Sequence, residues 1–185
     1  QFNEKLNLNQ LIGYSNYRLD FSASQDAYSG KFTSGITDLY YKNLLQYTFH
    51  KHRLSSGIQY TYHNLLPNRP EIMSGDTKFE TGPPNRYYTH EAAIFMEDDV
   101  EFSDKLSIKG GLRFTNYRHL GPYSLIQSTE NNQTVTAVFG SNQLIKQFNV
   151  LEPRFSLRYL INERSSVKLS FEKRNQFIHL LTVSA

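Results

Sequence analysis

Strict alternation of apolar and polar residues over long stretches is the feature that most constrains how this chain folds. In residues 106–115 the apolar set is Leu106, Ile108, Gly110, Leu112 and Phe114, and the other set is Ser107, Lys109, Gly111, Arg113 and Thr115. Successive side chains of a β-strand point to opposite faces, so this stretch predicts a strand with one apolar and one polar face. Residues 39–49, 54–63, 155–159 and 167–172 follow the same period, and helical periodicity is hard to find.

The connections between these runs alternate between short and long. Short polar connections lie around residues 50–53, 103–105 and 162–165, and longer irregular ones cover residues 22–32, 65–86 and 118–148. This order predicts an antiparallel meander with tight turns near Lys51, Asp104 and Glu163. The seven predicted strands lie near residues 6–21, 33–49, 53–65, 88–102, 105–119, 149–161 and 166–181.

Short turns at one end of a sheet and long loops at the other are typical of an outer-membrane barrel. The alternative is a soluble antiparallel sandwich, whose strands also alternate. Sandwich strands usually have about five or six residues, however, and the runs here are much longer. Length and periodicity together therefore favour the barrel.

Composition excludes several classes of protein. No stretch approaches the roughly 18 consecutive apolar residues of a membrane helix. The 185 residues include 13 Tyr and 13 Phe, which favour strands, and no Cys, which excludes disulfide and thiolate chemistry. The net charge of +3 is spread over interspersed acidic and basic residues, so no nucleic-acid partner is expected.

Two segments carry a resemblance to a known family. In "AAIFMEDDVEFSDKLSIKGGLRFTNY", Phe95 precedes the acidic pair Glu97 and Asp98, and a short polar turn leads into a Leu-x-Ile-x-x-Gly-Leu-Arg-aromatic strand. The segment "LEPRFSLRYLINERSSVKLSFEKRNQFIHLL", residues 151–181, looks like the next hairpin, and its end is similar to that of Bacteroidetes-type receptors. Together they resemble the barrel of TonB-dependent outer-membrane receptors.

The resemblance implies an all-β fold, an antiparallel up-and-down meander that is a partial segment of a large transmembrane β-barrel. Residues 1–185 are expected to form a single barrel segment of about seven strands, without a plug domain. Such barrels have about 22 strands, so seven strands cannot close one. The implied function is binding and import of a scarce nutrient: a siderophore, haem, a cobalamin, a glycan or a peptide. The implied partners are the TonB complex, reached through an absent N-terminal part, the extracellular nutrient and outer-membrane lipid. A soluble β-rich binding or adhesion module is the alternative.

Alternation also predicts which side chains face lipid. An apolar lipid face fits Leu112, Phe114, Leu157, Val167 and Leu169, and a polar lumen fits Lys109, Arg113, Arg158, Lys168 and Glu172. One residue conflicts with this pattern: if Val100 and Phe102 face lipid, Asp98 does too. A β-bulge or a position at the membrane interface would resolve the conflict, and the sequence leaves both open.

No catalytic, cofactor-binding or metal site is predicted, and the chain is not expected to be an enzyme. The acidic stretch "HEAAIFMEDD" favours salt bridges in the lumen over a metal site, and His50 and His52 are read as residues of a solvated turn. Gly110 and Gly111 indicate close packing or bending. A group of tyrosines near the long-loop ends of the strands is interpreted as an aromatic girdle or as ligand-stacking groups: Tyr14, Tyr17, Tyr60, Tyr62, Tyr87, Tyr88, Tyr117 and Tyr123.

Overall fold

All regular elements of the protein are β-strands. The computed structural model describes residues 5–79, 86–129 and 132–177. Within these ranges the strands are β1 (Leu6–Gln25), β2 (Tyr28–Phe49), β3 (His52–Ser74), β4 (Thr77–Phe79), β5 (Tyr87–Ser103), β6 (Leu106–Leu120), β7 (Tyr123–Thr129), β8 (Asn132–Phe139), β9 (Leu144–Asn162) and β10 (Ser165–Glu172). The described residues contain no helix long and apolar enough to cross a membrane.

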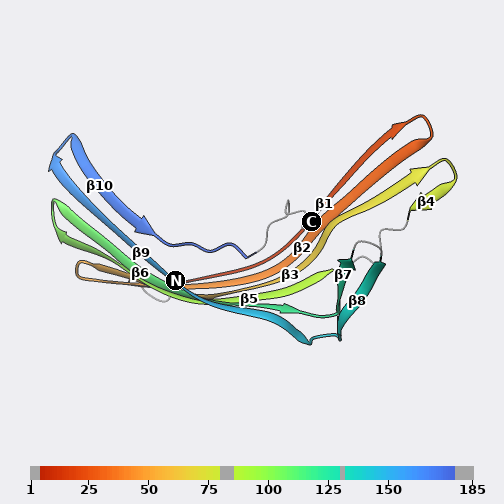
Figure 1. The fold of residues 1–185 in the computed structure, drawn as a ribbon. Coiled ribbons are helices and arrows are strands. Elements are labelled where there is room, and N and C mark those ends of the chain that lie inside the picture. The colour runs from red at the N-terminus through yellow and green to blue at the C-terminus, as the bar shows by residue number, and fades with distance from the viewer. Residues whose placement is uncertain (1–4, 80–85, 130–131, 178–185) are drawn as a thin grey trace.

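The main sheet is the predicted antiparallel meander. Its strands run in the order β1-β2-β3-β5-β6-β9-β10, and every neighbouring pair is antiparallel. These seven strands correspond to the seven predicted ones. β4 pairs only with β3, and β7 pairs with β8 in a separate two-stranded sheet. Figure 1 shows the main sheet as one layer bent into a half-barrel.

The three short connections are tight turns at one end of the sheet. They fall at residues 50–51, 104–105 and 163–164, as predicted. In the first turn His50 takes a positive φ of 50°, a left-handed conformation that non-glycine residues adopt uncommonly. Figure 1 shows all three turns on the left and the hairpin tips on the right.

The prediction of irregular loops at the opposite end is wrong for most of the described residues. β1 and β2 continue through residues 22–32 up to a two-residue turn at Asp26 and Ala27, and β3 continues to Ser74. Much of the segment 118–148 belongs to strands, including the β7–β8 hairpin. Apolar-polar alternation fades in these extensions, and backbone pairing between long hairpins keeps them extended without an apolar face.

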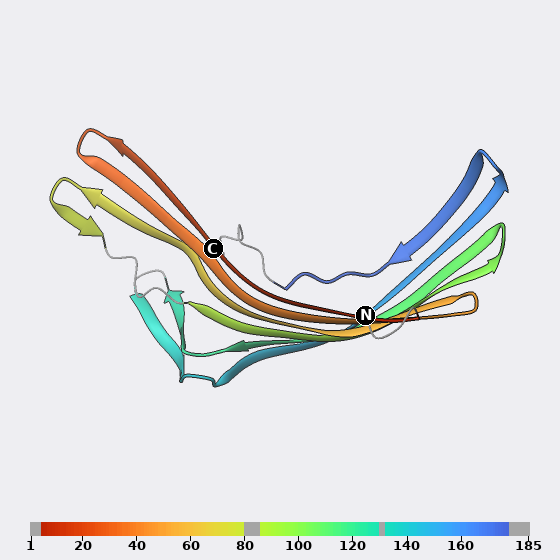
Figure 2. The same cartoon turned by 180° about the vertical axis from the view of Figure 1, so that it is seen from behind.

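The last predicted strand is shorter than expected. β10 ends at Glu172 rather than at residue 181, and residues 178–181 lie outside the described part of the chain. Residues 173–177 leave the sheet and run over its concave face (Figure 2). The amide of Lys173 still donates to the carbonyl of Pro153 on β9 at 3.1 Å, and ladder pairing stops there.

Two glycines let aromatic rings lie flat across neighbouring strands. Gly57 pairs with Phe95, and Gly13 pairs with Tyr40. A Cβ built on Gly57 would come within 2.8 Å of the Phe95 ring and would also overlap the carbonyl oxygen of Asn43. At these positions the missing side chain is a packing requirement of the sheet.

Candidate functional site

The convex face of the sheet is a broad apolar surface. Pairing registers place the apolar member of each alternating run on this face. Its exposed apolar side chains include Ile12, Leu39, Leu45, Tyr47, Phe49, Ile58, Ile94, Met96, Leu112, Phe114, Leu151, Phe155, Val167, Leu169 and Phe171. The predicted orientation of Leu112, Phe114, Val167 and Leu169 therefore agrees with the structure.

No second layer covers this surface within the described residues. Their buried hydrophobic core consists of only Leu65, Ala93 and Tyr117. A soluble sandwich would bury one face of each sheet against the other, about 10 Å away. A continuous exposed apolar surface of this extent is instead typical of contact with a membrane or a partner.

The concave face carries an ion-pair network centred on Arg113. The guanidinium lies 3.4 Å from a carboxylate oxygen of Glu91 and 3.4 Å from one of Glu152, and it donates to Gln59 at 3.2 Å. The Thr115 hydroxyl donates to Glu152 at 2.9 Å. Glu152 is only 6% exposed, so these partners compensate the cost of burying its charge. The network joins β3, β5, β6 and β9.

A second network lies closer to the tight turns on the same face. Lys109 contacts Glu97 at 2.7 Å, and Arg154 lies 3.7 Å from both Glu97 and Glu172. Arg174 contacts Glu172 at 2.8 Å. The predicted lumen orientation of Lys109, Arg113 and Glu172 agrees with these contacts.

The segment of residues 173–177 covers part of the Arg113 network. The backbone amide of Asn175 donates to Glu152 at 2.8 Å. The Phe177 ring stacks on Tyr117 with ring centroids 4.7 Å apart, and it also lies near Phe148 at 6.1 Å. The concave surface therefore changes from charged to aromatic on going from the turn end toward the hairpin tips.

A cluster of Tyr87, His119 and Tyr123 continues the aromatic region toward the tips. The Tyr87 ring lies 5.1 Å from the His119 ring and 5.4 Å from the Tyr123 ring, centroid to centroid. These residues lie beyond the roughly 9 to 11 residues next to the turns that a tilted strand needs to cross a bilayer. Burial, followed by a hydrogen bond with Tyr123, raises the pKa of Tyr87 to about 12, and burial lowers the pKa of His119.

The sheet divides the predicted tyrosine group between its two faces. The pairing registers place Tyr17, Tyr87 and Tyr117 on the concave face. The same registers place the other main-sheet members of the predicted group on the convex face: Tyr14, Tyr60, Tyr62 and Tyr88. The girdle interpretation fits only the convex group, and the ligand-stacking interpretation fits only the concave group.

The acidic stretch of β5 forms the predicted salt bridges on the concave face through Glu91 and Glu97. Asp98 does not, because the β5 register shows no bulge before residue 101 and the side chain points to the convex face. There a carboxylate oxygen lies 2.7 Å from Nδ1 of His52. His50 lies in the tight turn and is exposed, as predicted. His52 begins β3 beside the turn and is 39% exposed, but it also stacks on Phe49 at 4.9 Å. No group of three or more potential metal ligands occurs among the described residues.

The two glycines of β6 have different surroundings. A Cβ on Gly111 would lie 3.0 Å from the Cβ of its cross-strand neighbour Glu97, so close packing explains this glycine as predicted. A Cβ on Gly110 would meet nothing within 4 Å. Gly110 leaves an open gap on the convex face beside Asp98, which the sequence did not indicate.

An apolar convex face, a charged concave face and long antiparallel strands together define part of the wall of a membrane β-barrel with a polar lumen. The chain belongs to the TonB-dependent receptor-like β-barrel family, whose model matches residues 1–174. Members of this family are outer-membrane receptors and transporters. Comparisons with curated proteins and with solved structures found no match for this chain.

Proposed function

We propose that residues 1–185 form one wall segment of an outer-membrane receptor that binds a scarce nutrient outside the cell and imports it. The observation that carries the proposal is the division of one curved sheet into an apolar convex face and an ion-paired concave face. The apolar convex face is compatible with contact with lipid, and the ion-paired concave face is compatible with a water-filled or plugged lumen. The family match supports the same function.

The substrate belongs to the range that such receptors import: a ferric siderophore, haem, a cobalamin, a glycan or a peptide. The concave aromatic cluster of Tyr87, Tyr117, His119 and Tyr123 lies toward the hairpin tips, where a ligand arrives from outside. No covalent chemistry is assigned to the segment. The energy for import comes from TonB, through a part of the receptor outside residues 1–185.

A Bacteroidetes-type receptor is the specific subgroup that we propose. The support is sequence similarity alone: residues 176–181, at the end of the segment 151–181, resemble the corresponding stretch of Bacteroidetes-type receptors. A soluble binding module is the competing function. It would require another layer on the apolar face, and it predicts a protein that stays dispersed without detergent.

Deleting residues 127–143 from the full receptor tests the proposed role of the hairpin end. This segment includes the end of β7 and all of β8, which form their own sheet near the same end of the molecule as the hairpin tips (Figure 1). We expect nutrient uptake to be lost while the barrel still inserts and resists extraction from the membrane. Unchanged uptake kinetics in a correctly inserted deletion variant would contradict a ligand-binding role for this hairpin.

A further inference from the structure

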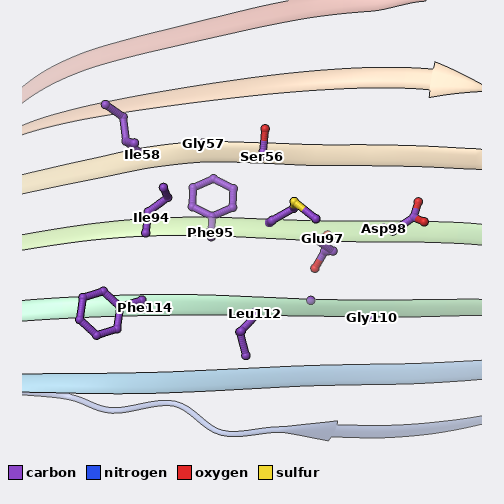
Figure 3. Close-up of a pocket in the computed structure, with 12 residues that line it drawn as sticks. Ser56, Gly57, Ile58, Ile94, Phe95, Glu97, Asp98, Gly110, Leu112 and Phe114 are labelled. Atoms are coloured by element: carbon purple, nitrogen blue, oxygen red, sulfur yellow. The ribbon is translucent and has the colours of Figure 1, made fainter.

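The convex face contains a groove that neither the transport route nor the ion-pair networks explain. It has a volume of about 670 Å³ and lies across β3, β5 and β6. Its walls include Ile58, Ile94, Met96, Leu112 and Phe114, and Figure 3 shows Asp98 and Gly110 toward one end of it. The gap left by Gly110 opens the groove at that end, because no atom would lie within 4 Å of a Cβ there.

Register explains why the groove is polar at one end only. Across β3, β5 and β6 the rows on the convex face are Leu54–Asp98–Gly110, Ser56–Met96–Leu112 and Ile58–Ile94–Phe114. The row with Asp98 is the one nearest the tight turns. The groove therefore runs from a carboxylate near the turn end to entirely aliphatic and aromatic walls farther along the strands.

Asp98 lacks a second donor on this apolar surface. One carboxylate oxygen, Oδ2, lies 2.7 Å from His52, whereas Oδ1 is shielded from water and has no hydrogen-bond partner among the described residues. The neighbouring cations Arg53 and Lys109 pair in register with Asp99, so they point to the concave face. Ionised groups at membrane depth are paired as a rule, so a further cationic donor is expected here.

We propose that this groove binds a phospholipid with a primary-amine headgroup from the periplasmic leaflet, an inference that rests on the proposed function. Short turns mark the periplasmic side of such barrels, so Asp98 lies at the headgroup end of the groove and the apolar walls extend toward the bilayer centre. An ammonium group supplies a full positive charge and N–H donors to the exposed part of the Asp98 carboxylate. One acyl chain then lies along Ile94, Leu112 and Phe114.

The polarity of the groove matches that of the lipid. Although Oδ1 is shielded, 35% of the Asp98 side chain stays exposed, which leaves the rest of the carboxyl group accessible to a headgroup. Phosphatidylglycerol has no cation to offset its phosphate charge beside Asp98, and the ammonium of a choline headgroup has no N–H to donate. The structure thus favours a primary amine over either alternative.

Native mass spectrometry of the full receptor in nanodiscs with equal phosphatidylethanolamine and phosphatidylglycerol tests the proposal. We expect the wild type to retain phosphatidylethanolamine at least about threefold over phosphatidylglycerol. Asp98→Asn should abolish this preference, and Gly110→Leu should reduce the retained lipid of either type by filling the groove. Asp99→Asn is the matched control: it removes the neighbouring carboxylate on the concave face and should keep the preference.

Equal retention of the two lipids by the wild type, or an Asp98→Asn variant that keeps the preference, would overturn the lipid site. A receptor with a photoreactive group at position 98 provides a further test. Specific crosslinking of that group to a partner protein that excludes lipid would also overturn the lipid site. Failure of the lipid site alone leaves the receptor inserted in the nanodisc and competent for uptake in cells. Failure of the proposed function would instead appear as a receptor that does not insert at all.

Discussion

At the residue scale, His119 shows how burial near the hairpin tips creates a pH dependence. The His119 ring packs against Tyr87 and Tyr123, and its Nε2 is shielded and has no hydrogen-bond partner among the described residues. Burial lowers the pKa of this imidazole from its ordinary value of 6.5. The folded protein therefore keeps His119 neutral at pH values where the unfolded chain already binds a proton.

The sign of the effect follows from proton linkage. Above pH 6.5 His119 is neutral in both the folded and the unfolded protein, so the packing of its ring contributes fully to stability. As the pH falls from 6.5 toward the lowered pKa of the folded state, only the unfolded chain binds the proton and stability is lost. We expect the unfolding temperature of the receptor to fall between pH 7.5 and pH 5.5, and to fall less in His119→Gln. Thermal unfolding of both proteins at the two pH values measures this. The same pH dependence in both would show that His119 is not responsible.

The sequence predicted the face of individual side chains better than their partners. Alternation alone placed Arg113 and Glu172 on the polar face, because the period of a strand is fixed by its backbone. The pairing of Arg113 with Glu152 depends on the register between β6 and β9, which are separated by the β7–β8 hairpin. Asp98 departed from the polar pattern, and only the continuous β5 register decided between a bulge and a lipid-facing carboxylate.

At the element scale, the pairing of glycine with a cross-strand aromatic ring fixes how β3 packs against its neighbours. Replacing Gly57 by Ala places a methyl group against the Phe95 ring and the Asn43 carbonyl oxygen. We expect a loss of about 1–3 kcal/mol of unfolding free energy, as for other overpacked sites. Gly110→Ala is the matched control, since its Cβ enters open space, and its effect should stay within about 1 kcal/mol.

Denaturant unfolding of the receptor in lipid vesicles compares the two glycine variants directly. The prediction concerns the difference in unfolding free energy between the two variants. Any general effect of replacing glycine by alanine in a strand is common to both and cancels in that difference. Equal stabilities for Gly57→Ala and Gly110→Ala would mean that the sheet relaxes around the new methyl group. The Phe95 ring would then not require a glycine opposite it.

The sequence predicted strand number and turn positions but not the ends of strands away from the turns. Where the convex face is apolar, each side chain of a strand contacts either lipid or the polar lumen. Apolar and polar residues therefore alternate strictly there, and the sequence shows the strand clearly. Beyond the apolar part of the strands both faces of β1, β2 and β3 contact mainly water. There the long hairpins hold residues 22–32 extended mainly through backbone pairing. The early end of β10 likewise reflects the contacts of Asn175 and Phe177 on the concave face, which involve distant strands.

At the scale of the whole molecule, the described residues form a half-barrel with almost no interior, so its stability depends on what covers each face. The β2 strand alone has 22 residues, about 70 Å at roughly 3.3 Å per residue, and exceeds the thickness of a bilayer. The apolar convex face is stable only if it is removed from water. A single sheet of this kind is therefore expected in a membrane, with lipid on its convex face. Measuring which face contacts lipid is the decisive test.

Leu112 and Arg113 test that orientation, because they are sequence neighbours that point to opposite faces of β6. Leu112 is 47% exposed on the convex face, whereas Arg113 pairs with Glu91 and Glu152 on the concave face. In the intact receptor, Leu112→Arg should destabilise the barrel by about 2–4 kcal/mol if the site lies near the bilayer midplane. Arg113→Leu should also be costly, because it leaves the buried Glu152 without its cationic partner.

Single cysteines at these two positions separate lipid contact from stability, since residues 1–185 contain no cysteine of their own. A fluorophore attached at position 112 should be quenched by a quencher dissolved in the lipid, and one at position 113 should not. Uptake measured for each labelled receptor serves as the control for correct folding. Equal quenching at both positions, or quenching only at 113, would contradict a membrane barrel in this orientation, because adjacent side chains of one strand cannot share a face.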